Sequence, residues 1–184
     1  MQIHHPEIGI CGLSCRLCPS YHTEGLSQCG GCKSEYRMGA GCPFITCAVK
    51  RKGIEFCWEC AEGDKCDKWR GQRKWSREHD SFVCYQKLED NISSIRQQGL
   101  SLFVKTQRTR EKLLKEMLRH FNEGRSKRFC CVAATVLEIG ELEAALIQAK
   151  KDSAGLALKE KSKVLRAILN EIAEKKHYCL SLRK

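Results

Sequence analysis

Ten cysteines near the start of this chain are the residues whose type and spacing could do chemistry. They lie in turn-rich, polar sequence among Gly, Lys and Glu, where a thiol adds little to packing. Several are separated by two residues, as in CGGC and CWEC. A tight turn of this kind lets both sulfurs face one ion while its N–H groups hydrogen-bond the thiolates, and glycine permits the positive φ that such turns use. The candidate metal ligands are Cys11, Cys15, Cys18, Cys29, Cys32, Cys42, Cys47, Cys57, Cys60 and Cys66.

The same pattern favours zinc and leaves one alternative open. Paired cysteines with glycine in the turn are typical of tetrahedral structural zinc sites, and the ten ligands suffice for two ions. An iron–sulfur cluster is the alternative, because Cys11, Cys15 and Cys18 follow in close order and a proline comes directly after Cys18 and Cys42, as in ferredoxin-type binding runs. We therefore expect two zinc ions, with an iron–sulfur cluster as the second hypothesis.

The other four cysteines are expected to have no role at a metal. Cys84, Cys130, Cys131 and Cys179 lie in apolar helical or strand-like patterns, where a thiol acts as a small hydrophobic side chain.

The elements that must position these residues fall into two parts. Residues 1–80 contain all three prolines and all three tryptophans but few apolar residues at helical or alternating spacing, so this part cannot bury a large aliphatic core. Residues 81–184 show amphipathic helical periodicity. The predicted fold class is α with a small irregular metal-stabilised part, a cysteine-rich zinc-knuckle-like N-terminal module (1–80) packed on an α-helical C-terminal unit (81–184).

Five helices are expected in the second part. Apolar residues at helical spacing mark 84–95, 113–121, 129–137, 142–149 and 164–172, with Gly99 and Gly124 as stop signals. The stretch 129–137 is apolar almost all round, so it is predicted to be the buried central helix, with Ser126 as its N-cap. Alternating apolar residues at 178–182 predict a short final strand.

Charge is distributed unevenly along the chain. The net charge is +11, of which residues 86–184 supply +9. Since four thiolates around a divalent ion carry about −2, any basic surface must come mainly from the second half. Segment 68–77 interleaves Trp69 and Trp75 with five basic residues. We expect both tryptophan rings to pack the cysteine-rich part against the helices rather than to bind nucleic acid. A protein partner for the helical half is therefore favoured over nucleic acid.

The remaining features argue against several protein classes. No stretch reaches the roughly 20 apolar residues that span a bilayer, and no export signal precedes the cysteines, so we expect a cytoplasmic protein without membrane association. We find no nucleophile–base pair and no phosphate-binding glycine loop. The leading hypothesis is a non-catalytic zinc-binding protein with a helical partner-binding half. The alternatives are an iron–sulfur electron carrier or redox sensor, and a zinc-dependent nucleic-acid binder.

The ordered cysteine pattern resembles one known family. CGLSCRLCP, then CGGC, then CPFITCAVKRKGIEFCWEC and Cys66, followed by GRSKRFCCVAATVL, is similar to the uncharacterised cysteine-rich family named domain of unknown function 3795. The resemblance extends over nearly the whole chain, and all ten candidate ligands fall where that family's cysteines are expected. It implies a metal-binding protein of bacteria or archaea with no established activity.

Overall fold

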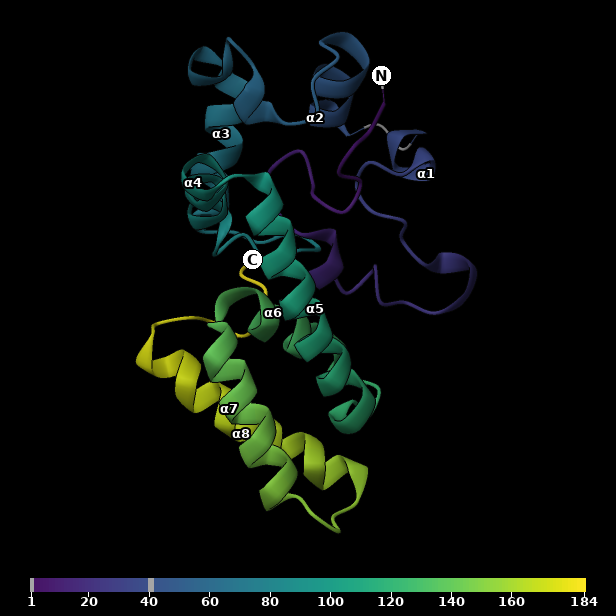
Figure 1. Ribbon diagram of the computed structural model, residues 1–184, viewed down its shortest axis with the longest axis vertical. Helices are drawn as coiled ribbons and strands as arrows, with labels where there is room; N and C mark the ends of the chain where they lie inside the picture. The colour runs from purple at the N-terminus through teal and green to yellow at the C-terminus, as the bar shows by residue number, and fades with distance from the viewer. Residues whose placement is uncertain (1, 40–41) are drawn as a thin grey trace.

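The protein is an elongated, predominantly helical molecule with the cysteine-rich part at one end (Figure 1). The computed structural model describes residues 2–39 and 42–184. Within those ranges there is no β-strand, only an isolated antiparallel bridge between Ile8 and Ser14. The α-helices are α1 (Glu35–Gly39), α2 (Pro43–Ile45), α3 (Asp67–Ser76), α4 (Leu88–Gln98), α5 (Leu100–Phe121), α6 (Lys127–Val136), α7 (Ile139–Asp152) and α8 (Leu158–Lys175).

Helix α5 is the long central element that joins the two ends (Figure 1). Gly99 separates it from α4 with φ of 84°, a conformation that glycine adopts without strain, so the chain changes direction at one residue. The first turns of α5 pack through Phe103 and Val104 on the cysteine-rich part. Its later turns pack through Leu114 and Met117 on α6, α7 and α8.

Helix α6 is buried on almost all sides, as its composition predicts. Seven of its residues are buried, in contact with α5, α7 and α8 through one continuous core. Its last carbonyls are satisfied by Arg110 of α5, whose guanidinium donates to Ala134 O at 3.0 Å and to Leu137 O. Ser126 precedes the helix as expected, but its hydroxyl hydrogen-bonds Glu123 and Ser162 rather than the helix N-terminus.

Helices α7 and α8 form an antiparallel pair that covers the far end of the core (Figure 1). Glu141 accepts the Glu138 N–H at 2.9 Å and so satisfies one free donor at the start of α7. Leu142 and Ala149 of α7 and Leu165 and Leu169 of α8 are buried between them, which confirms the apolar faces read from the sequence.

Apolar residues of the cysteine-rich part (1–80) pack against apolar residues that follow position 80. Ile8 and Phe56 pack with Ile95 and Phe103, one small core shared with α4 and α5. Leu13 and Trp69 pack in the same way with Leu88 and Ile92. The few aliphatic residues of the cysteine-rich part suffice for these cores because α4 supplies much of the apolar surface.

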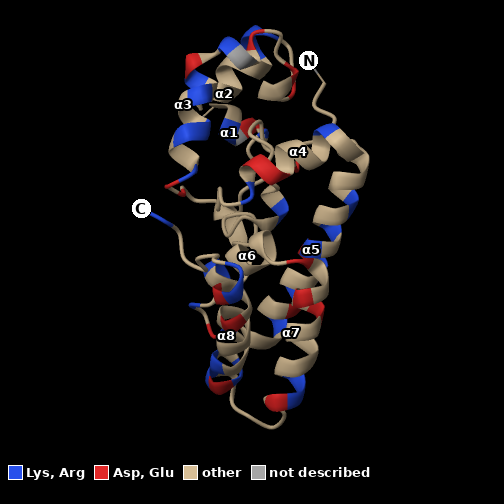
Figure 2. Ribbon diagram, turned by 90° about the vertical axis from the view of Figure 1, so that its left-hand side faces the viewer, with Lys and Arg blue, Asp and Glu red and all other residues tan. Residues whose placement is uncertain are grey.

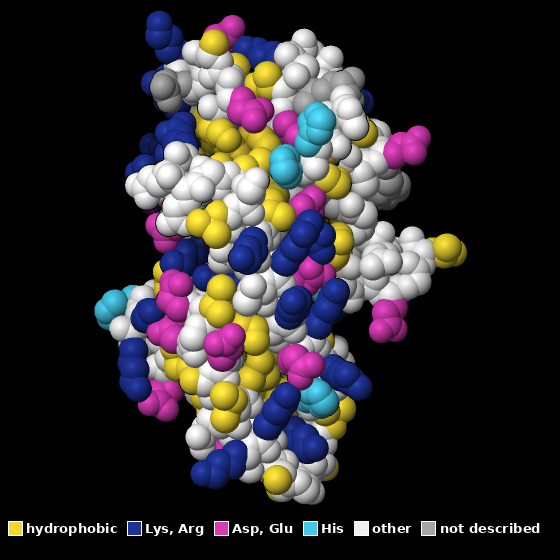
Figure 3. All heavy atoms as spheres, in the orientation of Figure 1, with side chains coloured by type: hydrophobic (Ala, Val, Ile, Leu, Met, Phe, Trp, Pro, Cys, Tyr) yellow, Lys and Arg dark blue, Asp and Glu magenta, His cyan; other side chains and the backbone are white. Residues whose placement is uncertain are grey.

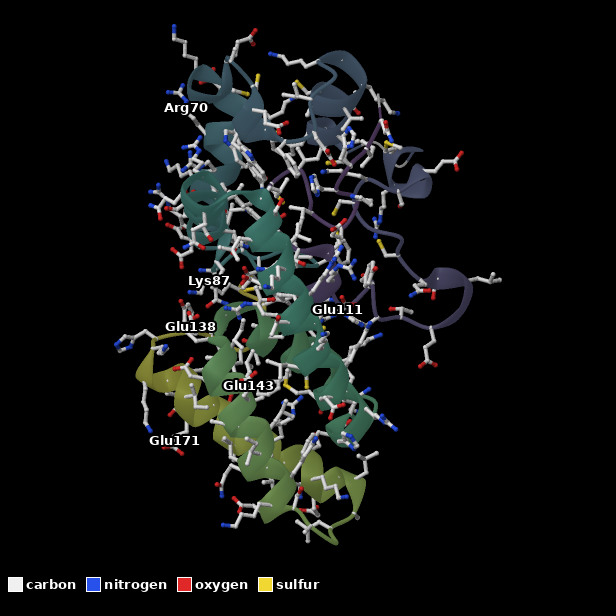
Figure 4. All side chains as sticks on the ribbon, in the orientation of Figure 1. Arg70, Lys87, Glu111, Glu138, Glu143 and Glu171 are labelled. Carbon is white, nitrogen blue, oxygen red and sulfur yellow. The ribbon has the colours of Figure 1, made fainter. Side chains whose placement is uncertain are left out.

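Two further contacts join the cysteine-rich part to the helical core. Leu17 in the 3₁₀ turn η1 (Cys15–Leu17) is buried in the large core, and the neighbouring Arg16 Nη1 lies 2.6 Å from Glu111 Oε2 of α5. Glu111 faces this turn (Figure 4). Lys127 at the start of α6 donates to Thr23 Oγ1 at 3.2 Å.

Two expectations about local structure are wrong, and one helix was not predicted. The final segment is not a strand. Leu180 is buried, but the Asp80 N–H donates to Arg183 O and the Arg183 N–H donates to the Asp80 carboxylate, so the tail docks on the end of α3 without pairing to another strand. Helix α4 begins at Leu88, which leaves Cys84 in a turn before it. Helix α3 was not predicted, because seven of its ten residues are polar or charged and hide the helical spacing.

In the part of the chain that the structure describes, no helix is both long and apolar enough to cross a membrane.

Candidate metal centre

Consecutive tight turns present the cysteines. Cys60 N–H donates to Cys57 O at 3.3 Å, Gly63 N–H to Cys60 O at 2.8 Å and Cys66 N–H to Gly63 O at 3.3 Å. These bonds form the 3₁₀ turns η4 (Cys57–Glu59) and η5 (Gly63–Lys65). These turns lie at the top of the molecule (Figure 1), and the fields of Cys60 and Cys66 act on Cys57.

The glycine turn of CGGC has the conformation that the sequence predicts. Gly31 has φ of 104°, and a Cβ there would lie 2.9 Å from Pro6 O and 3.6 Å from Cys15 Sγ. No side chain fits at this position without displacing backbone. The turn therefore holds Cys32 close to Cys15, whose Sγ accepts the Cys32 N–H at 3.3 Å.

A first group of sulfurs surrounds Cys32. A Cβ placed on Gly9 would lie 3.5 Å from Cys11 Sγ and 3.9 Å from Cys32 Sγ, so both sulfurs lie close to Gly9. Cys15 hydrogen-bonds Cys32, and the field of Cys32 also acts on Cys18. Backbone N–H groups of Ser20 and Tyr21 face the Cys18 sulfur. We call Cys11, Cys15, Cys18 and Cys32 the first thiol group.

The electrostatics of the first thiol group favour one early thiolate. Burial raises the pKa of Cys11 to about 12, and the hydrogen bond with Cys32 together with burial raises that of Cys15. The same hydrogen bond, helped by the cations of Arg37 and Lys33, lowers the pKa of Cys32 to about 7. Cys32 is thus the thiol that loses its proton first.

A second group surrounds Cys57. Burial, followed by the fields of Cys47, Cys66, Cys60 and Cys42 in that order, raises the pKa of Cys57 to about 12. Cys47 is carried by the helix that starts at Pro43 and continues as the π-helical segment η3 (Thr46–Arg51). We call these residues the second thiol group: Cys42, Cys47, Cys57, Cys60 and Cys66.

Cationic side chains lie beside both groups. Lys52 Nζ lies 3.3 Å from Cys60 Sγ and 2.7 Å from Glu62 Oε2. Lys33 and Arg37 act on Cys32. Positive charge at these places favours the thiolate form that a metal requires.

The two groups adjoin each other. Cys57 N–H donates to Ile10 O at 3.3 Å, next to Cys11, and the field of Cys57 contributes to the raised pKa of Cys11. Cys11, Cys57 and Cys66 pack against the same small core, which Leu13 and Trp69 belong to.

The thiols are neighbours but not a formed coordination shell. Across residues 2–39 and 42–184, no three His, Cys, Asp or Glu side chains converge closely enough to hold a metal ion. By donor type, however, both groups fit a thiophilic cation, because several sulfurs lie together and nearby N–H groups and cations stabilise the thiolate form that a metal binds.

Cys29 is not brought into either group by these contacts. It is half-buried, and its N–H donates to Ser20 O at 3.0 Å, which closes the loop that starts at Pro19. That loop carries the 3₁₀ turn η2 (Gly25–Ser27) and projects from the side of the molecule, with Leu26 fully exposed (Figure 3).

Three of the four cysteines without a predicted ligand role are buried hydrophobic side chains, as expected. Cys84, Cys130 and Cys131 belong to the large core, and burial raises the pKa of Cys130 to about 12. The expectation is wrong for Cys179, which is exposed in the C-terminal tail with its Sγ 3.1 Å from Ser181 Oγ.

A buried ion pair beside the first thiol group was missed by sequence reasoning. Lys33 Nζ lies 2.9 Å from Glu55 Oε1, donates to His5 O at 3.2 Å and sits 3.7 Å from the centroid of the Phe56 ring. Glu55 also accepts the N–H groups of His4 and His5. The pair therefore fastens the N-terminal segment, the turn of Cys32 and the turn of Cys57 together. Only its position directly after Cys32 could have drawn attention to Lys33.

Comparison with known proteins confirms the resemblance to an uncharacterised cysteine-rich family. The family model described as "Protein of unknown function (DUF3795)" matches residues 7–71. The match thus covers the segment that contains both thiol groups and α2, rather than nearly the whole chain. No curated protein and no solved structure matches this chain.

Proposed function

We propose that this protein binds two zinc ions through cysteine thiolates in its first 66 residues and has a structural, non-catalytic metal centre. The first site is Cys11, Cys15, Cys18 and Cys32. The second is Cys47, Cys57, Cys60 and Cys66, that is, Cys57 and the three cysteines whose fields act on it most strongly. Four thiolates complete the tetrahedral, closed shell of structural zinc.

The observation that carries the proposal is the crowding of thiols around Cys57. Burial, followed by the fields of four other cysteines, raises the pKa of Cys57 to about 12. Several half-buried thiols in one place contribute little packing, and their thiolates would repel one another, but a bound cation turns that repulsion into attraction. The turns with N–H groups near the sulfurs, and Lys33 and Lys52 beside them, support the same conclusion.

In this proposal the helical half has two roles. It completes the small cores under the thiol groups through α4 and α5. It also leaves the outer faces of α7 and α8 to a protein partner, with Ile147 and Leu158 exposed there. In Figure 3, acidic and basic side chains alternate around the hydrophobic ones on this half.

The test is metal content per chain for single variants purified without oxygen. Cys32→Ser and Cys57→Ser should each lose about one zinc equivalent, and the double variant should lose both, because a hydroxyl is a poor substitute for a thiolate. Cys29→Ser and Cys42→Ser are the matched controls and should keep both ions.

Two results would reject the proposal. Loss of a full equivalent in either control would show that the assignment of ligands is wrong. Iron and sulfide in stoichiometric amounts, with visible absorption in the purified protein, would replace zinc by an iron–sulfur cluster.

A further inference from the structure

The segment 65–77, which contains α3, holds half of the basic residues of the first 85. Lys65, Lys68, Arg70, Arg73, Lys74 and Arg77 lie within thirteen consecutive positions. Arg70, Lys74 and Arg77 are spaced i, i+4, i+7 and so share one face, a stripe about 10 Å long. Figure 2 shows Lys and Arg along the outer edge of α3, and Arg70 points outward in Figure 4.

Half of these six cations have no carboxylate partner. Among the residues that the structure describes, the side chains of Lys68, Lys74 and Arg77 make no ion pair with a carboxylate, and all three residues are exposed. Three of the nearby acids are already engaged: Asp67 pairs with Arg70, Glu89 with Arg73 and Asp80 with Arg183. The exposed Glu78, next to Arg77, is the acid that offsets part of this charge.

The C-terminal tail adds to the same surface. Arg183 donates to Arg77 O at 2.7 Å and to Ser76 O at 3.0 Å, the carbonyls at the end of α3. This contact places the exposed Lys184 next to the helix, and Figure 2 shows the C-terminus directly beside it.

Two aromatic side chains are exposed beside the cations. Trp69 is 5% exposed and packs in a small core, as expected, but the expectation fails for Trp75, which is 42% exposed. Its ring stacks on that of His79 with centroids 5.1 Å apart and planes 11° apart. Tyr85 meets the edge of the Trp75 ring at 6.0 Å, so the loop before α4 lies alongside, and Phe82 in that loop is 75% exposed.

We propose that α3, the loop that follows it and the C-terminal tail bind single-stranded nucleic acid. Lys68, Lys74 and Arg77 would meet phosphates, and Trp75 and Phe82 would stack with bases. Exposed rings on the same part of the molecule as unpaired cations suit unpaired bases, which can stack on Phe82 and on the face of Trp75 that His79 leaves open, and they suit a duplex less because its bases are already stacked. The buried Trp69 side of α3 leaves too little apolar surface for insertion into a bilayer. This inference stands on the surface of α3 and does not depend on metal binding.

The experiment measures binding of the full-length protein to labelled single strands of about twelve nucleotides, oligo-dT and oligo-U in separate arms, by fluorescence anisotropy over a range of salt concentrations. We expect saturable binding that weakens with salt, and quenching of tryptophan fluorescence that Trp75→Phe abolishes. Equal affinity in both arms would assign the site to any single strand, and a preference for oligo-U would assign it to RNA; either supports the proposal.

Substitutions separate the phosphate contacts from the stacking contacts. Lys74→Gln with Arg77→Gln should reduce the slope of log affinity against log salt by about 1.4, since each phosphate contact to a single strand contributes about 0.7. Phe82→Ala should weaken binding by roughly 5- to 100-fold with an unchanged slope. Phe82 is largely exposed, so this variant is expected to fold even where Trp75→Ala does not.

The matched controls lie in the helical half and on the projecting loop. Lys112→Gln with Lys159→Gln removes the same charge from exposed positions of α5 and α8, and Leu26→Ala removes an exposed apolar side chain. Neither should change the salt slope or the affinity by more than about twofold.

Four outcomes would overturn the proposal. They are no saturable binding, tighter binding to a duplex of the same length, equal effects of the control and test substitutions, and binding to dextran sulfate or anionic vesicles with the same dependence on Phe82.

Discussion

Replacing Lys33 by methionine tests the buried ion pair that fastens the first thiol group. The Lys33 side chain is completely buried and that of Glu55 is 8% exposed, so Lys33→Met leaves a carboxylate without its cation in a largely dry site. Removing one partner of a buried pair costs about 3–5 kcal/mol. Because Glu55 keeps the N–H groups of His4 and His5, we expect a loss of about 3 kcal/mol in the free energy of unfolding.

The double variant makes the prediction specific. Lys33→Met with Glu55→Leu removes both charges, and replacing a buried ion pair by apolar residues is often close to neutral, so most of the lost stability should return. The backbone N–H groups that Glu55 satisfies lose their acceptor, which leaves a net cost of about 1 kcal/mol.

The assay is urea-induced unfolding with free zinc held constant, since metal binding alters the apparent stability. Lys175→Met is the matched control, because Lys175 and Glu171 form an exposed i, i+4 pair 2.7 Å apart, and it should cost less than about 0.5 kcal/mol. In Figure 4, Glu171 lies on the outer surface of α8. If Lys33→Met proves no more destabilising than this control, the reasoning about the buried pair is refuted.

Three further predictions follow from single contacts. Arg110→Met removes the donor to two buried carbonyls at the end of α6 and should lower the free energy of unfolding in urea by about 2–4 kcal/mol; a loss under 1 would contradict this role. Burial alone would raise the pKa of Asp80, but its bonds with Arg183 hold that pKa below the ordinary 3.8. The unfolded chain therefore binds the proton more tightly than the folded one. The stability that the Asp80–Arg183 contact contributes is present above about pH 5 and lost as pH falls below 4. Arg183→Met should reduce this fall in the free energy of unfolding at low pH, and an unchanged fall would contradict the assignment. Gly31→Ala should unfold at lower urea than Gly53→Ala, because both glycines have positive φ but only at Gly31 would a Cβ meet backbone; equal midpoints would show that the turn adapts.

The helical half could be predicted largely from the sequence. Apolar spacing over 113–121, 129–137, 142–149 and 164–172 identifies helices and their buried faces, because one side of each packs on a common core. The start of α5 at Leu100 could not be predicted in this way, since its first turns pack on Ile8 and Phe56 from the other part.

The candidate site could be predicted as a set of residues but not as an arrangement. Spacing identifies cysteine pairs, yet the proximity of Cys11 to Cys32 depends on Gly9 and on the turn at Gly31. The pairing of distant turns also depends on the contact between Lys33 and Glu55, and neither residue has a motif. Tertiary contacts of this kind leave no periodic signal.

The two failures in the C-terminal tail have the same cause. Alternating apolar residues predict a strand, but a strand also needs a partner edge. Here Asp80 supplies both a carboxylate and a backbone N–H to Arg183, and this places Cys179 in solvent instead of in a sheet.

X-ray absorption of the native protein, purified without oxygen, tests the proposed metal centre most directly. The proposal predicts about two zinc ions per chain, each surrounded by about four sulfur atoms at about 2.3 Å, and no visible absorption. A zinc shell made mainly of nitrogen and oxygen, or iron bridged by sulfide, would contradict it.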